Sequence, residues 1–440
     1  MIKRYIVSLL VLIFYIPAAP ASDLKTEISK SAHGDWTVTY KANSPISRIG
    51  FSRNPNNART KRWSPITEGF EIIQRDNKEY IVKTDGSQFT KAKFFLTPSY
   101  THLPKDYAPF SPFSEGGMLF HSARFFACSN DCKTEHNAWQ LTLRVPDNEY
   151  IALHGEKITK SATWTDNSDG TNVYVGTQEL IENKDYIAII DPNLPSLIKT
   201  SLSEDIPKLM TYFDKKLGPL TNGKPMLFAS YAKVSNTESQ GGTLPNQIFI
   251  HWDRDDLDEK IANNNFVFNT LWFFAHEVAH LFQRGEIPLY ENENESWLHE
   301  GHADYLAAKS LRYLYPETKS FVSDRLLKFE NHCADGLQNL TLEEAAKKER
   351  FDLYYTCGLL IHKAIDEALK STSSLDTFLI WKNYRRQATT SKIVGADVFL
   401  NMVEQHSTSD FVSKIQFLIK NKVSLSELRE LLMTESTLKP

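Results

Sequence analysis

The sequence contains no long low-complexity tract. Of its 440 residues, 24% are charged and 41% are hydrophobic, so apolar residues are plentiful enough to form a buried core. These proportions exclude a chain that is disordered along its whole length. The length is sufficient for two domains.

An excess of basic residues is also missing. The formal net charge is −4, and residues 1–21 carry two positive charges, on Lys3 and Arg4, without any acidic residue. Removal of that segment would change the net charge to −4 − 2 = −6. Because nucleic-acid-binding domains are usually basic, we expect no nucleic-acid partner.

The apolar run near the N-terminus, residues 5–16, is shorter than the ~20 residues needed to cross a bilayer. It follows Lys3 and Arg4 and precedes a cluster of small residues ending at Ala21, an order typical of a secretory signal peptide. We therefore expect cleavage after Ala21, export to the periplasm or the extracellular space, and no membrane span in the mature chain. The alternative is an uncleaved membrane anchor.

Cysteine is scarce, with four residues in the chain. Cys128 and Cys132 lie close together, and Cys333 and Cys357 are the other pair. Without repeated CxxC spacing, a four-cysteine zinc site is disfavoured. In an exported protein we expect disulfides 128–132 and 333–357, and the alternative is four buried thiols.

The pattern of hydrophobic residues changes along the chain. Up to residue 177, short β-type runs alternate with turn residues, which predicts an antiparallel β domain over residues 22–177. From residue 178 to 440 we expect a second domain of mixed strands and helices, so the fold class is α+β. Its expected strands are 186–190, 226–231 and 248–252, and its expected helices are 203–217, 265–284, 296–313, 318–329 and 353–370.

An HExxH motif lies in the segment FFAHEVAHLF, residues 273–282, within an expected helix that is apolar on nearly every face. Such a helix is buried, and buried imidazoles are costly unless something satisfies them. His276 and His280 are four residues apart, so they share one helix face and both rings can reach a single ion. Zinc accepts two imidazole nitrogens in this arrangement.

A second segment, WLHEGHADYL at residues 297–306, begins another expected helix. Glu300 follows His280 after 19 intervening residues, which is enough for a turn and a returning helix. We therefore expect Glu300 to be the third ligand of one zinc ion per chain. Three protein ligands leave a fourth position open, as in catalytic rather than structural zinc sites.

Asp304 lies one helical turn beyond Glu300 and shares its face. It could accept the second ring N–H of a ligating histidine, and the alternative is a surface aspartate. We expect the remaining histidines near these segments to be packed, hydrogen-bonded or substrate-facing rather than ligands: His251, His299, His302, His332 and His362.

Together these segments resemble the gluzincin peptidases, especially the membrane alanyl aminopeptidase and leukotriene A4 hydrolase-like family, and more loosely the glycyl aminopeptidases. HEVAH and WLHEGHADYL are similar to that family's HExxH and WLNEGxxxY. The resemblance implies that His276, His280 and Glu300 bind zinc and that Glu277 is the general base. It also implies a thermolysin-like catalytic domain behind an N-terminal β domain.

The same family has a tyrosine in a YxxG-type motif that stabilises the oxyanion. Tyr355-Thr356-Cys357-Gly358 is similar to that motif. The resemblance therefore implies that Tyr355 is a catalytic donor. Tyr354 is its rival, and a packing role for either tyrosine is the alternative.

Three departures from the family pattern stand out. The family has 18 residues between the second histidine and the glutamate, where this chain has 19, and His299 replaces the usual asparagine. The GxMEN-like strand, whose glutamate binds the substrate amino terminus, appears as GGTLPN at residues 241–246 without a glutamate. Aminopeptidase and endopeptidase specificity therefore both stay open. We expect residues 241–246 to form a loop that lines the cleft with strand 248–252, or an ordinary turn before a core strand.

The chemistry expected from these residues is hydrolysis of a peptide bond by a zinc-activated water, with Glu277 as base. The alternative is a non-catalytic, zinc-stabilised protein of the cell envelope that binds peptides. Glu277 argues against that alternative because zinc ligation does not require it. The family also allows a non-peptide substrate such as an epoxide.

Overall fold

The computed structural model describes residues 23–54, 58–103, 106–133, 138–167, 169–234, 236–285 and 287–433. The expected signal peptide, residues 1–21, lies outside the described residues. Within the part that is described, no helix is both long enough and apolar enough to cross a bilayer.

The chain divides into two compact units. The first comprises residues 1–110, 120–151 and 158–175, and the second comprises residues 111–119, 152–157 and 176–440. Two short stretches thus group with the second unit although they precede residue 176 in sequence.

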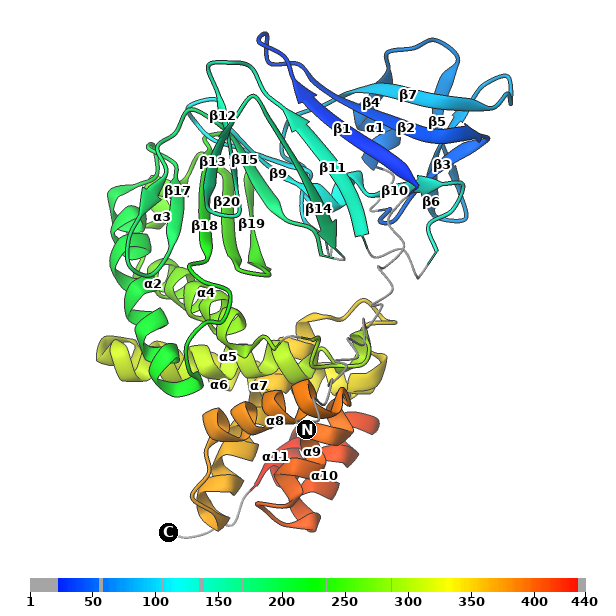
Figure 1. The fold of residues 1–440 in the computed structure, drawn as a ribbon. Helices are drawn as coiled ribbons and strands as arrows, with labels where there is room; N and C mark the ends of the chain where they lie inside the picture. Colours follow the sequence, from blue (N-terminus) through cyan, green and yellow to red (C-terminus); the bar gives the residue numbers. More distant parts are fainter. Residues whose placement is uncertain are drawn as a thin grey trace, which may run out of the picture. The chain divides into compact units, whose positions relative to one another are not determined.

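The first unit is built on two sheets (Figure 1). Among the described residues, one sheet has the order β14-β11-β1-β2-β7-β4 and the other the order β10-β3-β6-β5. The strands of the first sheet are β1 (Leu24–Lys30), β2 (Trp36–Ile46), β4 (Trp63–Pro65), β7 (Phe89–Leu96), β11 (Ala138–Arg144) and β14 (Ser161–Asn167). Those of the second are β3 (Arg48–Phe51), β5 (Phe70–Arg75), β6 (Lys78–Lys83) and β10 (Ala127–Ser129), and a short helix α1 (Ala58–Arg62) precedes β4.

Alternation of apolar and polar residues explains these strands. In β11, Trp139, Leu141 and Leu143 are buried while their neighbours face outward. The expected antiparallel pairing describes these two sheets except where β1 and β11, both among the described residues, run parallel. Parallel strands need a long connection between them, and more than a hundred residues separate β1 from β11 in sequence.

A further five-stranded sheet within the described residues has the order β13-β12-β15-β9-β8. Its strands are β8 (Phe110–Pro112), β9 (Met118–His121), β12 (Tyr150–Leu153), β13 (Glu156–Thr159) and β15 (Asn172–Gly176).

The sheet of the second unit has the order β16-β17-β18-β20-β19 in the described chain. Its strands are β16 (Ile181–Glu182), β17 (Ile187–Ile190), β18 (Met226–Ala232), β19 (Thr237–Leu244) and β20 (Gln247–Arg254). Strands β17, β18 and β20 are parallel, and β19 pairs antiparallel with β20. The expected mixed sheet is therefore present.

Strand β19 corrects the expectation of a loop at residues 241–246. Residues up to Leu244 pair with β20, and the turn is confined to Pro245 and Asn246. Gly241 serves close packing here: a Cβ atom would overlap the ring of Phe273 and lie 2.9 Å from the carbonyl oxygen of Phe249. A glycine pair is an ambiguous signal because glycine permits both turns and close approach.

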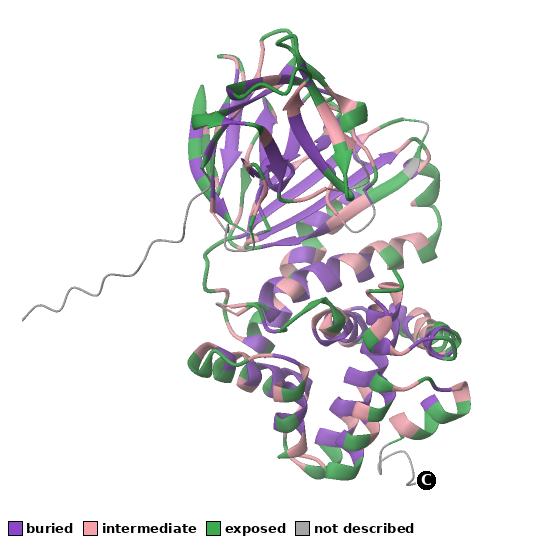
Figure 2. Ribbon diagram, turned by 90° about the vertical axis from the view of Figure 1, so that its right-hand side faces the viewer, coloured by how far each residue is buried: buried purple, intermediate pink, exposed green. Residues whose placement is uncertain are grey.

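Helices complete the second unit, and the long helices expected from sequence are all present. Figure 2 shows buried residues on the inward sides of these helices and exposed residues on their outer sides, as amphipathic patterns predict. The helices are α2 (Ser196–Leu217), α3 (Leu257–Lys260), α4 (Asn264–Gln283), α5 (Trp297–Leu314), α6 (Lys319–Leu337), α7 (Asp352–Thr372), α8 (Thr377–Ser391), α9 (Ala396–Glu404), α10 (Ser409–Lys420) and α11 (Leu425–Leu432).

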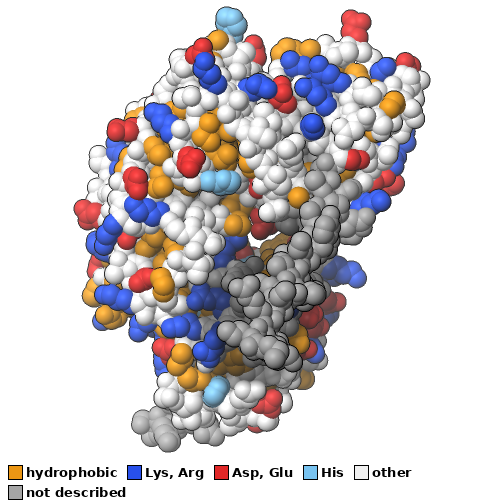
Figure 3. All heavy atoms as spheres, in the orientation of Figure 1, with side chains coloured by type: hydrophobic (Ala, Val, Ile, Leu, Met, Phe, Trp, Pro, Cys, Tyr) orange, Lys and Arg blue, Asp and Glu red, His pale blue; other side chains and the backbone are white. Residues whose placement is uncertain are grey.

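Both expected disulfides are present. Cys128 bonds to Cys132, and Cys333 bonds to Cys357. The second bond joins α6 to α7. Acidic and basic side chains both occur across the face of the protein drawn in Figure 3, in keeping with a small net charge.

Candidate active site

Helix α4 carries the HExxH motif in the core of the second unit. Asn263 caps the helix, since its side chain accepts a hydrogen bond from the Asn265 backbone N–H at 2.8 Å. His276 and His280 lie on one face, with ring centroids 4.5 Å apart. Their Nε2 atoms are 2.9 Å apart, so the two rings converge on one point.

Glu300, on α5, completes this cluster. Its Oε2 atom lies 3.2 Å from Nε2 of His276 and 3.1 Å from Nε2 of His280. One ligand atom from each of the three residues lies within 4.8 Å of the others. The structure thus brings together the three residues expected to bind metal.

The tautomer of His276 follows from its other ring nitrogen. Nδ1 lies 2.9 Å from Oδ1 of Asp304, which also accepts a hydrogen bond from Nε1 of Trp272 at 2.7 Å. Because an ionised carboxylate only accepts hydrogen bonds, Nδ1 of His276 carries the proton. Its Nε2 atom therefore faces the cluster, and Asp304 has the orienting contact considered from sequence.

His280 is oriented by a different partner, the amide of Gln283. Nδ1 of His280 lies 2.8 Å from Oε1 of Gln283, whose Nε2 donates to the carbonyl oxygen of His299 at 3.1 Å and contacts Nδ1 of His302 at 2.8 Å. With the amide hydrogens directed to those two acceptors, Oε1 must accept from Nδ1–H of His280. The Nε2 lone pair of His280 also faces the cluster.

Because Nδ1 of each histidine is used by its own partner, the two Nε2 atoms and the Glu300 carboxylate are the atoms that can bind a metal ion. Without a metal, a proton on Nε2 of His276 can bridge to Glu300, and a bound cation would take the place of that proton. Tetrahedral zinc with bonds of ~2.0–2.1 Å would separate its ligand atoms by about 3.3 Å, close to the separations of 2.9–3.2 Å between these atoms. Two imidazoles and a carboxylate are also ligands that zinc accepts, so the residues fit a zinc ion.

The local electrostatics favour positive charge at this point. Burial lowers the pKa of His276, but Asp304 and Glu300 outweigh burial and raise that pKa well above its ordinary value. Burial raises the pKa of Glu300, but His280, His299 and a hydrogen bond from His276 hold it well below its ordinary value. An ionised Glu300 beside two imidazoles suits a divalent cation.

Glu277, the residue between the two histidines in the motif, is buried and oriented by strand β19. Its Oε2 atom accepts a hydrogen bond from Oγ1 of Thr243 at 2.7 Å. The same hydroxyl lies 2.9 Å from the carbonyl oxygen of Glu277. Thr243 was missed from sequence because it lies in the stretch interpreted as a loop.

The two candidate tyrosines of α7 differ clearly in their surroundings. Tyr354 is 1% exposed, and its hydroxyl accepts a hydrogen bond from the backbone N–H of Ala346 at 2.9 Å. The ring of Tyr355 stacks beside His276, with centroids 5.6 Å apart and planes inclined by 30°. The structure therefore places the ring of Tyr355 beside His276, whereas the hydroxyl of Tyr354 is bound by Ala346.

Close contact between α5 and α7 explains how Tyr355 reaches this position. The helices meet at Gly301 and Gly358, and a Cβ atom on Gly358 would lie 2.7 Å from the carbonyl oxygen of Trp297 and 2.8 Å from Cα of Gly301. Only glycine on both helices allows this approach. The glycine of the YxxG segment is therefore required by the close packing of α7 against α5.

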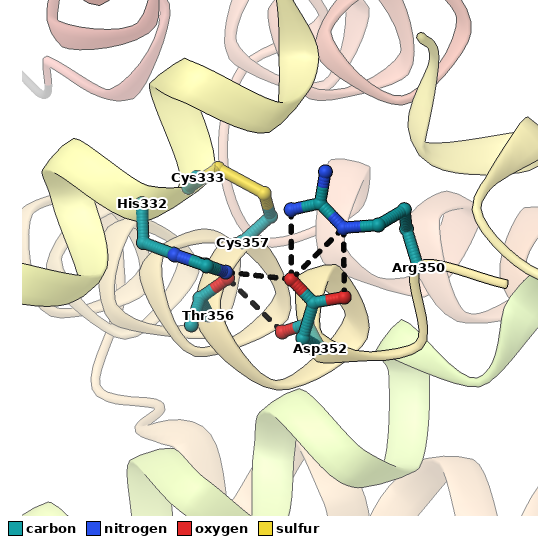
Figure 4. The surroundings of a disulfide bond; sticks show 6 residues. All are labelled: His332, Cys333, Arg350, Asp352, Thr356 and Cys357. Carbon is teal, nitrogen blue, oxygen red and sulfur yellow. Dashed lines mark hydrogen bonds and ion pairs between the residues drawn. A yellow bond between two sulfur atoms is a disulfide. The ribbon is translucent and has the colours of Figure 1, made fainter. Parts of the chain in front are cut away.

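The start of α7 is held on its other side by the disulfide and by charge (Figure 4). Asp352 pairs with Arg350 at 2.8 Å and with Nε2 of His332 at 2.6 Å. Burial raises the pKa of Asp352, but these two partners outweigh it and lower the pKa. An ionised aspartate in the first turn also favours the helix dipole.

The other histidines do not join the ligand cluster. Nε2 of His299 lies 3.2 Å from Oε1 of Glu300, and its ring stacks on Tyr290 with centroids 4.5 Å apart. His251 contacts Oγ of Ser230 at 2.8 Å within the sheet. Burial lowers the pKa of His302 well below its usual value and that of His362 to about 3, so both are neutral packing residues.

Comparison with known proteins adds evidence on the fold. No family model matches the sequence, and no curated protein matches it. Among solved structures, an aminopeptidase N family protein from Idiomarina loihiensis superposes with a TM-score of 0.67 at 13% identity, covering 93% of this chain and 78% of that one. The fold is that of the M1 zinc metallopeptidases.

Two further M1-type structures agree with this conclusion. A mutant M1 zinc metallopeptidase from Deinococcus radiodurans, bound to a Tyr-Ser-Ala substrate, has a TM-score of 0.55 at 14% identity and covers 92% of this chain and 94% of that one. Leukotriene A4 hydrolase from Saccharomyces cerevisiae has a TM-score of 0.51 at 12% identity, covering 87% and 64%. The expected α+β fold, a β domain followed by a domain of mixed sheet and helices, is confirmed.

Proposed function

We propose that this protein is an exported zinc metallopeptidase that hydrolyses peptide bonds. The observation that carries the proposal is the convergence of one ligand atom each from His276, His280 and Glu300, on the helix that also holds the buried carboxylate of Glu277. In this proposal residues 1–21 are removed, residues 22–177 form an N-terminal β domain and residues 178–440 form the catalytic domain.

The proposed cofactor is one zinc ion per chain, held by His276, His280 and Glu300. When bound, it would lower the pKa of a water molecule and polarise the carbonyl group of the substrate. Asp304 and Gln283 bind Nδ1 of the two histidines, which leaves Nε2 of both rings available to the ion.

Glu277 acts as the general base in this proposal. Its carboxylate accepts the proton of the attacking water and then delivers that proton to the leaving amine. The hydrogen bond from Thr243 restrains the carboxylate in one orientation. Less conformational entropy is therefore lost when the carboxylate takes the position that the reaction needs. Tyr355 donates its hydroxyl hydrogen to the oxyanion that develops on the carbonyl oxygen.

Export is supported by the two disulfides, which persist in oxidising compartments. The peptide substrate is supported by the shared fold, since the mutant M1 zinc metallopeptidase from Deinococcus radiodurans was solved with a Tyr-Ser-Ala substrate and two-domain M1 zinc metallopeptidase mutants were solved with L-tryptophan or L-arginine. Aminopeptidase specificity is a separate question, because Pro245 occupies the turn at the end of the GGTLPN segment and provides no carboxylate. Equal cleavage of free and N-acetylated peptides would exclude the aminopeptidase version.

Glu277→Gln and Glu300→Ala test the proposal together. Wild-type protein should contain about one zinc per chain and cleave members of a mixed peptide library. Glu300→Ala should lose the zinc, whereas Glu277→Gln should keep it and lose roughly 10²–10⁴-fold in cleavage rate. The exposed Glu317→Gln is the matched control and should change neither quantity.

Two results would contradict this account. A wild-type protein that binds no zinc would remove its basis. Zinc binding without cleavage of any peptide would favour the non-catalytic peptide-binding protein instead.

A further inference from the structure

Helix α8 directs a stripe of three side chains toward the C-terminal end of α4. Thr377, Trp381 and Arg385 are spaced by four residues and therefore share one face of the helix. Trp381 and Arg385 donate hydrogen bonds to backbone carbonyls of α4, and Thr377 contacts His302, which in turn contacts Gln283 of α4. All of these elements belong to the second unit.

Arg385 binds the ends of two helices. Its Nη1 atom donates to the carbonyl oxygen of Phe282 at 2.5 Å, and its Nη2 atom donates to that of Leu217 at 2.9 Å. These carbonyls lie in the last turns of α4 and α2, where a helix has no partners of its own for them. A guanidinium group there also interacts favourably with both helix dipoles.

Trp381 holds two further groups of the site. Its Nε1 donates to the backbone carbonyl oxygen of Gln283 at 3.1 Å. Its ring stacks on His302, with centroids 4.2 Å apart and planes inclined by 26°. Trp381 therefore limits movement both of the last residue of α4 and of the imidazole against which the Gln283 amide rests.

Thr377 ends a chain of hydrogen bonds that begins at the metal ligand His280. Nδ1 of His302 accepts from Gln283, so Nε2 of His302 carries the hydrogen and donates to Oγ1 of Thr377 at 3.1 Å. The backbone N–H of Thr377 is itself held by Oδ1 of Asp366 at 2.8 Å. Gln283, His302 and Thr377 are all buried, so no water competes for these contacts.

We propose that α8 is part of the metal site. Thr377, Trp381 and Arg385 act as positioning residues which, through Gln283, hold His280 in the tautomer and orientation that present Nε2 to zinc. The inference rests on the proposed zinc function and extends it to a helix that provides no ligand. If α8 loosens, the Gln283 amide can rotate, and the lone pair of His280 is then no longer held in place.

Zinc affinity, measured by competition with a chromophoric chelator, tests this inference without relying on activity. Gln283→Leu should weaken zinc binding by roughly 10–100-fold, the usual cost of losing a partner of a ligating histidine. Arg385→Met should weaken it less, in the same direction. Arg386→Met is the matched control, because Arg386 is the exposed neighbour on α8 and contacts Asn383 instead of α4; it should bind zinc like wild type.

A gentler pair covers the case in which Arg385→Met does not fold. Thr377→Val replaces the hydroxyl with a methyl group of similar shape and should weaken zinc binding. Thr377→Ser keeps the hydroxyl and should restore wild-type affinity. This rescue separates the hydrogen bond from mere packing.

Unfolding of the metal-free variants distinguishes positioning from general stability. If the variants lower the stability of the metal-free protein but bind zinc with unchanged affinity, α8 is only structural and the inference is overturned. If wild type itself binds no zinc, the proposed function fails as well. Zinc binding by wild type together with unchanged affinity in Gln283→Leu and Thr377→Val would overturn the role of α8 alone.

Discussion

The two ends of the metal helix support their histidines in different ways. At the His276 end, Nδ1 donates to a carboxylate, Asp304, which comes from the neighbouring helix α5 and is shared with Trp272. At the His280 end, Nδ1 donates to a neutral amide, Gln283, from the same helix.

The comparison shows how a neutral amide can orient a histidine ring as a carboxylate does. A carboxylate needs little help, since it accepts only and binds an imidazole N–H strongly. An amide can turn over and present its NH₂ group instead, so it has to be fixed by its neighbours. This requirement explains the buried chain through His302 and Thr377.

The largest effect is expected where α5, the helix that provides the His276 partner, meets α7. Gly301→Ala and Gly358→Ala place a methyl group against backbone atoms that cannot move aside, so we expect a loss of about 3 kcal/mol or more in the free energy of unfolding. Gly285→Ala is the control, since its nearest neighbour is the Arg385 side chain at 3.3 Å. Thermal unfolding of the three variants checks the order, and equal melting temperatures would contradict it.

A smaller effect is expected when Asp304 is made neutral. Asp304→Asn leaves both histidines with amide partners, but without a network like that behind Gln283, so zinc affinity should fall roughly 10–100-fold. Chelator competition measures this loss. Asp324→Asn, an exposed change on α6, should leave the affinity unaltered. An Asp304→Asn protein with wild-type affinity would show that the carboxylate is not needed.

Acid should lower the stability of the folded protein through His362. Burial lowers the pKa of His362 from 6.5 to about 3, so the unfolded chain binds more protons between these values. The contribution of His362 to the free energy of unfolding should therefore be fully present above pH ~6.5. Between that pH and about 3 it should fall by about 1.4 kcal/mol per pH unit. His362→Phe should reduce the slope of unfolding free energy against pH by about one proton. An unchanged slope would mean that His362 is not buried as a neutral residue.

The smallest effect is expected from a change at Thr243, which contacts neither metal-binding histidine nor its hydrogen-bond partner. Thr243→Val removes the hydrogen bond to Glu277 without altering a ligand or its partner, so kcat should fall by roughly tenfold, equivalent to about 1.4 kcal/mol. Zinc affinity should stay at the wild-type value. Steady-state kinetics and chelator competition check the two expectations, and a loss of zinc would show that Thr243 supports the metal rather than the base.

Local patterns were sufficient to predict much of this site. The spacing of His276 and His280 predicts a shared helix face, and the pattern of apolar residues around Glu300 predicts a second helix. Both predictions agree with α4 and α5. Helical periodicity is a property of neighbouring residues, which is why it can be recognised without the fold.

Other features needed contacts between distant segments. The Gly241–Gly242 pair suggested a loop, but the ring of Phe273 on α4 requires a glycine in strand β19. The different surroundings of Tyr354, bound by Ala346, and Tyr355, beside His276, also come from residues outside α7. The stripe on α8 was visible as a spacing of four residues, yet nothing in the sequence indicates that it faces the end of α4.

By itself, the sequence determined which residues could provide the metal ligands and the base, because HExxH spacing and the second glutamate are local signals carried by helix geometry. Only the tertiary structure decided how these residues are held, through Asp304, Gln283, Thr243 and α8. The physical reason is that hydrogen-bond direction and tautomer depend on partners that are far away in sequence and become neighbours only when the core packs.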